Sequence, residues 1–378
     1  MGKILDLLEE ETYAKRYKSH RFQHDEDNTP GIQYDEREVT WKSHGETVEH
    51  KHPVNIKEKA KAVAESPSIF SYFLDGSRRT YKVDDFSYFN NIYPIIAGQV
   101  GVGCCTRVNK EMKCEHIFNE NIIVLPDKAE KDEWDADKSC AQWLYKVNNL
   151  NHTQNINFKD ILMYSSAEDN KLESKGIAVI QDYMTNLEKQ LVANLVSDQE
   201  LDQNNYLIKD GSLEYRQDLH QGGLNLSDEH IANNYKYVVG VSKSFNPTKC
   251  KVKGGGSNSD IVANLQLYER TPAYMHQSGT VGDVCFVIWY LRIQDSKYTQ
   301  NIFDGILKVE KVVTDPKELV DGVDSSEIDK ISAHLINERS PVCYGSDARW
   351  ANHLYPVYLT ETFVKSRYLS NNYFLQLF

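Results

Sequence analysis

The sequence predicts an α/β fold in which helices flank a mixed β-sheet. Several short apolar runs have the β-branched and aromatic composition of buried strands. One longer segment, residues 176–195, repeats apolar side chains in steps of three and four, which is the spacing of an amphipathic helix. Because strands dominate the first part of the chain and helices alternate with strands later, the pattern indicates an α/β or mixed α+β class.

Size and composition restrict the kind of protein. The chain has 378 residues, of which 40% are hydrophobic and 26% charged, as is ordinary for one large or two smaller soluble globular domains. No apolar run approaches the length of a membrane span, and the first residues do not form a secretory signal. The seven cysteines include no CxxC pair, so we expect reduced thiols in a cytoplasmic protein and no zinc site. The net charge of −12 argues against nucleic-acid binding over the whole surface, but not against a local basic channel.

We divide the chain into a region at residues 1–56 and a domain at residues 57–378. Apolar positions within residues 1–19 predict a short amphipathic helix. Because so short a helix is not stable alone, it either packs on the protein's own core or helps to assemble a dimer or to bind a partner. Residues 20–56 are polar and are interpreted as a solvated or partner-dependent arm. A metal site is the alternative for the histidines of this arm, His44, His50 and His52.

The remaining elements follow from the composition of each segment. A helix over residues 57–66 leads into a first strand at residues 69–74, and a polar turn is expected after Asp75. The highly charged residues 127–174 are predicted to be an insertion with its own helices. The chain ends in a helix around residues 354–369. Further strands are predicted at residues 93–105, 122–125, 206–208, 237–241, 285–291 and 306–313, the last with the alternation of a half-exposed strand.

Two Asp-Gly-Ser strings each follow an apolar run, at Asp75 and Asp210. Each is interpreted as a strand that ends on a carboxylate and turns at the glycine. If the two strands are neighbours, their carboxylates gather at one end of the sheet, where they repel each other and need a cation. Mg²⁺ or Mn²⁺ commonly supplies that charge in phosphoryl-transfer sites. For either string alone, an ordinary turn is the alternative.

Further candidate residues surround these strings. Glu188 lies at the edge of the apolar stripe of the helix at residues 176–195, so its carboxylate either points inward towards the strand ends or is exposed. Lys243 follows a predicted strand and either approaches a scissile phosphate as a point charge or is solvated. Five basic residues are candidate contacts to a nucleic-acid backbone: Arg78, Arg79, Lys249, Lys251 and Lys253. The two arginines adjoin the first Asp-Gly-Ser string. The lysines lie in a glycine-rich loop, for which a flexible surface loop is the alternative interpretation.

The order of these features resembles that of the NurA nucleases. The Asp-Gly-Ser strand is followed by helical Glu188, by a second Asp-Gly-Ser-Leu strand and by Val-Gly-Val-Ser-Lys243. The resemblance continues to about residue 368 through Trp-Tyr-Leu-Arg292, Val-Glu310 and a terminal Tyr355-Pro-x-x-Leu, interrupted only by the charged insertion. It implies an RNase H-like fold and a DNA nuclease that depends on Mn²⁺ or Mg²⁺.

The resemblance also implies roles for particular residues and partners. Asp75, Glu188 and Asp210 match the family's metal-binding carboxylates. Lys243 matches a lysine that follows a strand, and Tyr355 matches the active-site tyrosine. Members of the family form ring-like dimers and work with HerA, a hexameric ATP-driven DNA translocase. A homodimer and a HerA-like partner are therefore implied.

One position departs from the family pattern. Where the family has a histidine eight residues after the tyrosine, this chain has Phe363, which we expect to pack inward from its helix. The departure bears on histidine-assisted proton transfer and not on the carboxylates. Together with the N-terminal arm and the charged insertion, it indicates a divergent member, of a kind that would fit a NurA–HerA pair in anti-phage defence.

Three functions are weighed. A metal-dependent DNA nuclease, acting in DNA end processing or in defence, is favoured by the ordered motifs. A DNA clamp of the same fold that cuts nothing is the second interpretation, and Phe363 is its main support. An unrelated hydrolase with paired carboxylates, such as a glycosidase, is the third. The scattered tryptophans argue against the glycosidase, because they do not suggest a tryptophan-rich cleft.

Overall fold

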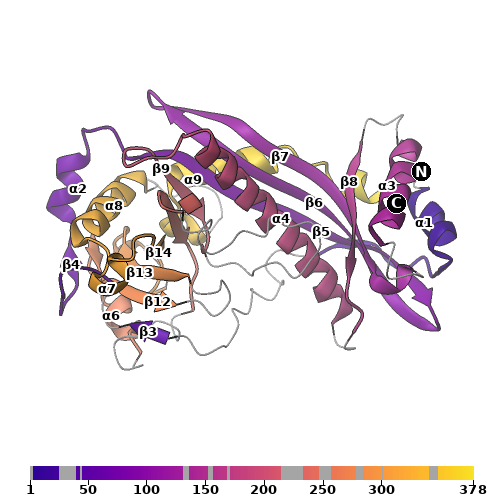
Figure 1. Cartoon of the computed structure of the whole chain (residues 1–378), viewed down its shortest axis with the longest axis horizontal. Helices are drawn as coiled ribbons and strands as arrows, with labels where there is room; N and C mark the ends of the chain where they lie inside the picture. Colours follow the sequence, from indigo (N-terminus) through magenta and orange to yellow (C-terminus); the bar gives the residue numbers. More distant parts are fainter. Residues whose placement is uncertain are drawn as a thin grey trace.

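A mixed β-sheet forms the centre of the molecule, and helices pack on both of its faces (Figure 1). This arrangement confirms the α/β class predicted from the sequence. The structure is a computed structural model that describes residues 3–24, 40–42, 45–130, 136–151, 156–167, 171–213, 233–246, 257–277, 284–299, 301–339 and 348–378.

Three long antiparallel strands dominate the sheet: β5 (Phe70–Tyr88), β6 (Asn91–Val108) and β7 (Glu111–Pro126). Two-residue turns join them. At the first turn Phe89 and Asn90 both have left-handed backbone dihedrals, with φ of 50° and 68°, as expected for a tight hairpin turn. The three strands extend along the molecule towards the end where the two chain termini lie (Figure 1).

β5 continues without a break past Asp75, so the predicted polar turn at this position is wrong. The strand persists because β6 pairs with it throughout this stretch, with Asp75 opposite Gly103. Both faces of β5 are largely buried, and a two-sided strand tolerates a glycine where a neighbouring element approaches closely. The first Asp-Gly-Ser string is thus part of a strand and not its end.

The strand order along the sheet is β3-β12-β13-β14-β10-β9-β5-β6-β7-β8. β9 (Tyr206–Asp210) is parallel to β5, and β10 (Val238–Ser242) is parallel to β9. Within β7-β6-β5-β9-β10 only β6 runs against the other four strands, which is the arrangement of an RNase H-like sheet. The predicted sheet architecture is therefore confirmed.

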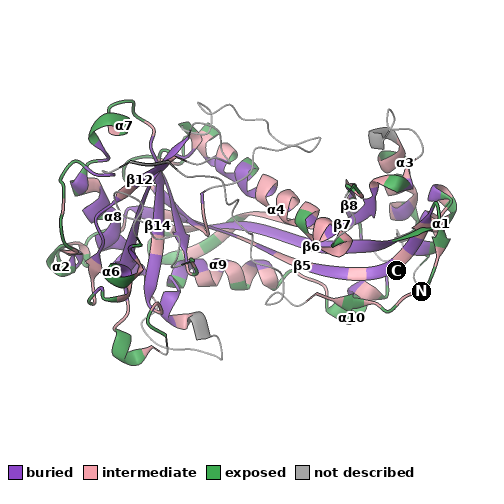
Figure 2. Cartoon of the chain, turned by 90° about the horizontal axis from the view of Figure 1, so that it is seen from below, coloured by how far each residue is buried: buried purple, intermediate pink, exposed green. Residues whose placement is uncertain are grey.

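Helices enclose the sheet from both sides (Figure 2). α4 (Leu172–Ser197) buries Ile180, Met184 and Leu191 against one face, as the apolar stripe predicts. α8 (Ser325–Glu338) and α9 (Tyr355–Lys365) contribute to a second apolar core. We call these sides the α4 face and the α9 face.

β14 (Ile306–Val312) lies between β10 and β13 and is buried along almost its whole length. The prediction of a half-exposed strand is wrong here, because its lysines and glutamate face ion-pair partners inside the fold instead of solvent.

The highly charged residues 127–174 contain α3 (Ala136–Asn151), as predicted. They also contain β8 (Phe158–Tyr164), which pairs in parallel with β7 and extends the main sheet. Part of this stretch is thus an integral strand of the sheet.

The predicted N-terminal helix is α1 (Ile4–Thr12). Ile4, Leu5 and Leu8 are fully buried in a core formed with β5, β6 and α3. The interpretation that this helix packs on the protein's own core is confirmed, so these side chains are not available to a partner.

The arm predicted at residues 20–56 is held by the fold where the structure describes it. Glu46 is buried and accepts hydrogen bonds from the guanidinium of Arg270, 2.8 Å away at its Nη2, and from the backbone of Ala273. His50 lies 3.8 Å from the same carboxylate. His44 lies outside the described residues.

The remaining elements are short or lie at the two ends of the sheet. No helix in the described part of the chain is long and apolar enough to span a membrane. The strands are β1 (Lys15–Arg16), β2 (Phe22–Gln23), β3 (Thr40–Lys42), β4 (Val54–Asn55), β11 (Glu269–Arg270), β12 (Tyr274–Gln277) and β13 (Cys285–Arg292). The helices are α2 (Lys57–Val63), α6 (Ser259–Ala263), α7 (Glu318–Asp321) and α10 (Asn371–Leu375).

Candidate functional site

The parallel pairing of β5 and β9 places two of the predicted carboxylates side by side. Leu74 of β5 is in register with Lys209 of β9, and Asp75 and Asp210 are the next residues on the two strands. Since side chains alternate between the faces of a sheet, both carboxylates project from the same face. Gly103 lies opposite Asp75, and a Cβ placed on Gly103 would lie 2.6 Å from Val364 of α9. The two carboxylates therefore project from the α9 face.

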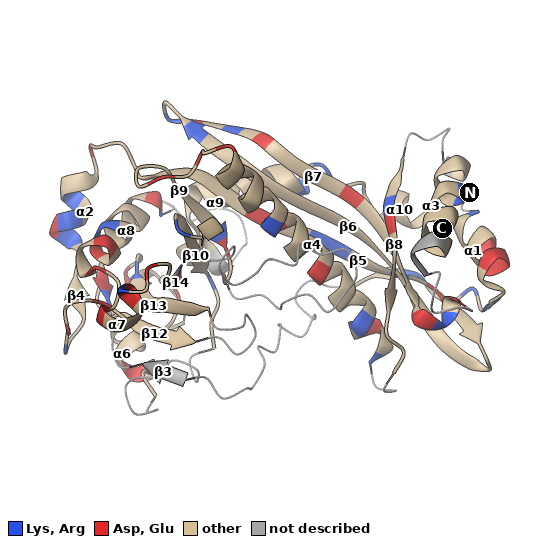
Figure 3. Ribbon diagram, in the orientation of Figure 1, with Lys and Arg blue, Asp and Glu red and all other residues tan. Residues whose placement is uncertain are grey.

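Lys243 joins these carboxylates from the neighbouring strand. Asp210 pairs with Val241 of β10, and Lys243 follows two residues later on the same face. Its Nζ lies 2.9 Å from Asp210 Oδ2. It also lies 3.4 Å from Oε2 of Glu361, which comes from α9. β9, β10 and α9 therefore meet at a group of opposite charges (Figure 3), which we call the acid–lysine cluster: Asp75, Asp210, Lys243 and Glu361.

Burial and the neighbouring charges shift the pKa values of Asp75 and Lys243 in this cluster. Asp75 is only 5% exposed, and its burial, together with the charge of Asp210, raises its pKa well above the usual range. Burial opposes the charge of Lys243, but the attraction of Asp210, Asp75 and Glu361 outweighs it, so the pKa of Lys243 lies above its ordinary value. Two carboxylates, Asp210 and Glu361, thus contact one buried ammonium, and the charge of Asp75 acts on it as well.

Glu361 was missed by the sequence analysis. It lies on α9, two residues before Phe363. The position of α9 on the sheet depends on tertiary packing. Lys365, four residues later on the same helix, lies 2.9 Å from the other carboxylate oxygen of Glu361. A Glu-x-x-x-Lys pair on a helix is a common surface feature, and nothing in its spacing reveals contact with a distant strand.

Glu188 points inward, as its position at the edge of the apolar stripe predicts, and is 5% exposed. Its Oε2 forms an ion pair of 2.8 Å with Lys209 Nζ. Its other oxygen, Oε1, would lie 2.3 Å from a Cβ placed on Gly76, so the glycine makes room for this carboxylate. Gly76 and Lys209 project from the α4 face, so Glu188 lies across the sheet from the Asp210–Lys243 pair, although its charge still acts on Asp75.

The other predicted site residues do not join the cluster where the structure describes them. Tyr355 is 46% exposed at the start of α9. Arg78 donates from Nε to Gln181 of α4 at 2.6 Å. Arg79 lies with its guanidinium 5.0 Å from the ring centre of Tyr368. Three further predicted residues lie outside the described residues: Lys249, Lys251 and Lys253.

Phe363 does not pack into the core as expected. Its side chain is half-buried, and the guanidinium of Arg367 lies 4.7 Å from its ring centre. The inward positions of α9 are taken by Val357, Thr360 and Val364. Because of the helical spacing, Phe363 falls beside this stripe and not within it.

The donor set of the cluster fits a hard divalent cation in its chemistry. Carboxylate oxygens are the ligands that Mg²⁺ and Mn²⁺ prefer, and two of the three carboxylates already contact a cationic group, on which the charge of Asp75 also acts. That group is the ammonium of Lys243. Among the described residues, no three His, Cys, Asp or Glu side chains form a group that could hold a metal ion. Binding of a divalent cation would therefore require the side chains of the cluster to rearrange, and Lys243 would give up its contacts with Asp210 and Glu361.

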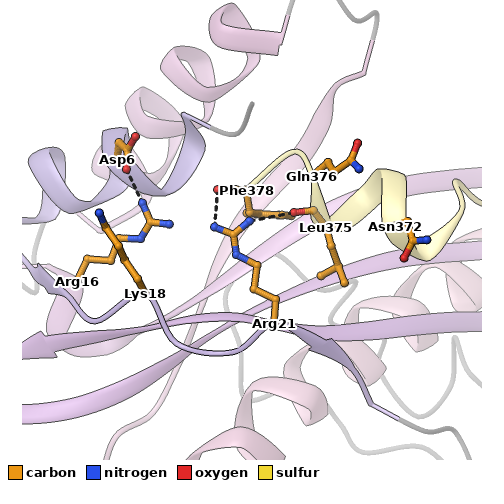
Figure 4. Close-up of a pocket in the computed structure, with 8 residues that line it drawn as sticks. All are labelled: Asp6, Arg16, Lys18, Arg21, Asn372, Leu375, Gln376 and Phe378. Atoms are coloured by element: carbon orange, nitrogen blue, oxygen red, sulfur yellow. Dashed lines mark hydrogen bonds and ion pairs between the residues drawn. The ribbon is translucent and has the colours of Figure 1, made fainter.

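A cavity of about 630 Å³ lies at the other end of the molecule, next to the two chain ends (Figure 4). Its guanidinium groups already have partners within the chain. Arg16 is paired with Asp6 and Asp84. Arg21 donates to the carbonyl oxygens of Leu375 and Phe378, at 3.1 and 2.9 Å. The Arg16 contacts fasten the N-terminal segment to α1 and β5, and the Arg21 contacts fasten it to the C-terminal end of the chain, which is a structural role.

Comparisons with known proteins add little to this geometry. No protein-family model matches the chain, and no curated protein matches it. Among solved structures, the chain is similar to the NurA nuclease from Sulfolobus solfataricus with 12% sequence identity, over 86% of this chain and 81% of that chain, at a TM-score of 0.39. Similarity at this level does not show membership of the same family, and the assignment of the site depends on the contacts described above.

Proposed function

We propose that this chain is a DNA nuclease whose active site is the acid–lysine cluster and whose activity depends on Mn²⁺ or Mg²⁺. The observation that carries the proposal is that Asp210 of β9 and Glu361 of α9 contact one buried ammonium beside Asp75 of β5, whose pKa is raised by burial and by the charge of Asp210. A surplus of buried carboxylate is costly to the fold and is typical of sites that act on charged substrates. The order of sequence motifs, which resembles that of the NurA nucleases, supports the same class of activity.

Each residue of the cluster has a defined part in this proposal. Asp75, Asp210 and Glu361 would hold the divalent cation. When bound, such an ion supplies a water of lowered pKa and charge stabilisation at the scissile phosphate. Lys243 would exchange its carboxylate partners for the phosphate, whose charge it would offset at short range. Its position at the end of β10, in a segment fixed by the hydrogen bond from Asn352 Nδ2 to the Lys243 carbonyl at 2.6 Å, orients it for this role.

Glu188 is assigned a different part from that implied by the sequence resemblance. Its ion pair with Lys209 on the α4 face balances its charge and fixes α4 against β9. We therefore propose Glu361 as the third carboxylate of the site, with Glu188 acting on Asp75 through its charge alone.

A second candidate is a DNA clamp of the same fold that cuts nothing. The internal charge pairing favours it, because Lys243 already neutralises part of the carboxylate charge without a metal ion. Phe363, in place of the family's histidine, favours it as well. A homodimer, a HerA-like ATPase as partner and a role in DNA repair or anti-phage defence are proposals that rest on the sequence resemblance.

Digestion of linear and plasmid DNA by the full chain tests the proposal. We expect cleavage with Mn²⁺ or Mg²⁺, none with EDTA, and none by Asp75→Asn or Asp210→Asn when circular dichroism shows that both remain folded. Cleavage by both variants at the wild-type rate would overturn the site assignment. DNA binding without turnover, with or without metal, would establish the clamp.

A further inference from the structure

Two cysteines face each other across β6 and β7. Cys105 and Cys114 are directly opposed partners in the antiparallel register. Opposed residues of an antiparallel pair have Cα atoms roughly 4.5–5.5 Å apart, which lies within the roughly 4.4–6.8 Å that a disulfide requires. The register shifts by one residue beside this pair, so that Cys104 pairs with His116, while Cys105 stays in the regular register that runs from the hairpin turn and faces Cys114.

The two thiols also interact directly. Hydrogen bonding between the side chains of Cys105 and Cys114 is the main cause that lowers the pKa of Cys105 to about 7, with burial opposing it and Thr360 assisting. The same contact, together with burial, raises the pKa of Cys114. Near neutral pH, Cys105 therefore loses its proton more readily than an ordinary thiol does. The thiolate that results is the reactive form of cysteine.

We propose that Cys105 and Cys114 form an oxidisable dithiol, a modification site that hydrogen peroxide converts to a disulfide between β6 and β7. Both residues are free cysteines in the structure. Cys105 is buried, whereas Cys114 is partly exposed, so the pair is reached from the side of Cys114. Cys104 is excluded as a partner because its side chain is fully buried in the core on the α4 face.

The chemistry is balanced by the two thiols and one peroxide. The Cys105 thiolate attacks one peroxide oxygen, so that an S–O bond forms, the O–O bond breaks and hydroxide leaves. The Cys114 sulfur then attacks Cys105, the S–S bond forms and the S–O bond breaks. The Cys114 proton goes to the departing oxygen, which leaves as water, and the proton that Cys105 released on forming its thiolate neutralises the hydroxide. Each sulfur is oxidised and the peroxide is reduced to two waters.

Peptide mapping of the oxidised full chain tests this proposal. Trypsin cuts after Arg107 and Lys113, so Cys105 and Cys114 fall on separate peptides. After reduction and removal of the reductant, treatment with hydrogen peroxide should join these peptides, lower the mass of the chain by two hydrogens and remove one pair of free thiols. Dithiothreitol should restore all seven thiols.

Matched variants separate the pair from its neighbours. Cys105→Ala should abolish the cross-linked peptide, whereas Cys104→Ala and Cys285→Ala should leave it unchanged. The wild-type cross-link is measured directly and does not depend on the folding of any variant. Peroxide treatment that leaves the two peptides separate, or a cross-link that persists in Cys105→Ala, would overturn the proposal.

Discussion

Replacing Lys243 by methionine removes the ammonium around which Asp75, Asp210 and Glu361 lie, at nearly constant volume. The side chains of Lys243, Asp210 and Glu361 are 10%, 21% and 17% exposed, so solvent screens their attraction only in part. Removing one partner of a buried ion pair costs about 3–5 kcal/mol. Glu361 keeps Lys365, and Asp75 can take up a proton, so we expect the free energy of unfolding to fall by about 3 kcal/mol, at the low end of that range.

Urea unfolding followed by circular dichroism measures this loss. Lys365→Met is the matched control, since Lys365 contacts the same Glu361 but is 34% exposed, and we expect it to cost about 0.5 kcal/mol. Mn²⁺ should restore part of the stability of Lys243→Met, because an ion that binds only the folded state stabilises it. Equal losses in the two variants, with no effect of Mn²⁺, would refute the reasoning about the cluster.

Three further changes probe single features of the site. Because the pKa of Asp75 is raised in the folded state, the contribution of its protonated form to stability is complete below the ordinary aspartate pKa of 3.8 and is lost as pH rises through the folded-state pKa. The free energy of unfolding, measured against pH, should therefore decline over this range in wild type, and Asp75→Asn should flatten the decline. Gly76→Ala should cost about 1–3 kcal/mol in urea unfolding, since the new Cβ would lie 2.3 Å from Glu188 Oε1, and an unchanged stability would contradict the placement of this carboxylate. Phe363→Ala should cost only about 1 kcal/mol, well below the roughly 3–5 kcal/mol of a core phenylalanine, because its ring packs on Arg367 at the surface; a larger loss would show that it is part of the core.

The sequence predicted one carboxylate's position better than the other's. Asp210 ends β9, and Gly211 follows with φ of +84°, so the local turn signal was sufficient there. At Asp75 the same three residues lie inside a strand of 19 residues. Pairing with β6 decides this outcome, and such long-range pairing leaves no mark in the local sequence.

Helical periodicity identified the burial of Glu188 but not its partner. The stripe of α4 gives the phase of Glu188 relative to the core, whereas Lys209 is brought to it only by the crossing of α4 over β9. Glu361 has no local signal at all, since its contact with Lys243 joins residues that are 118 positions apart. Fold class and the strand-end aspartate thus follow from local pattern, and the composition of the cluster follows from tertiary packing.

The rates of DNA cleavage by Glu361→Gln and Glu188→Gln, measured side by side with Mn²⁺, test most directly that the site lies on the α9 face. Both substitutions keep the side-chain shape and remove one charge, so they differ in the face of the sheet that they alter. We predict that Glu361→Gln loses about tenfold or more in rate, equivalent to about 1.4 kcal/mol of transition-state stabilisation, while Glu188→Gln retains most of its activity. Full activity of Glu361→Gln together with an inactive, folded Glu188→Gln would contradict the account.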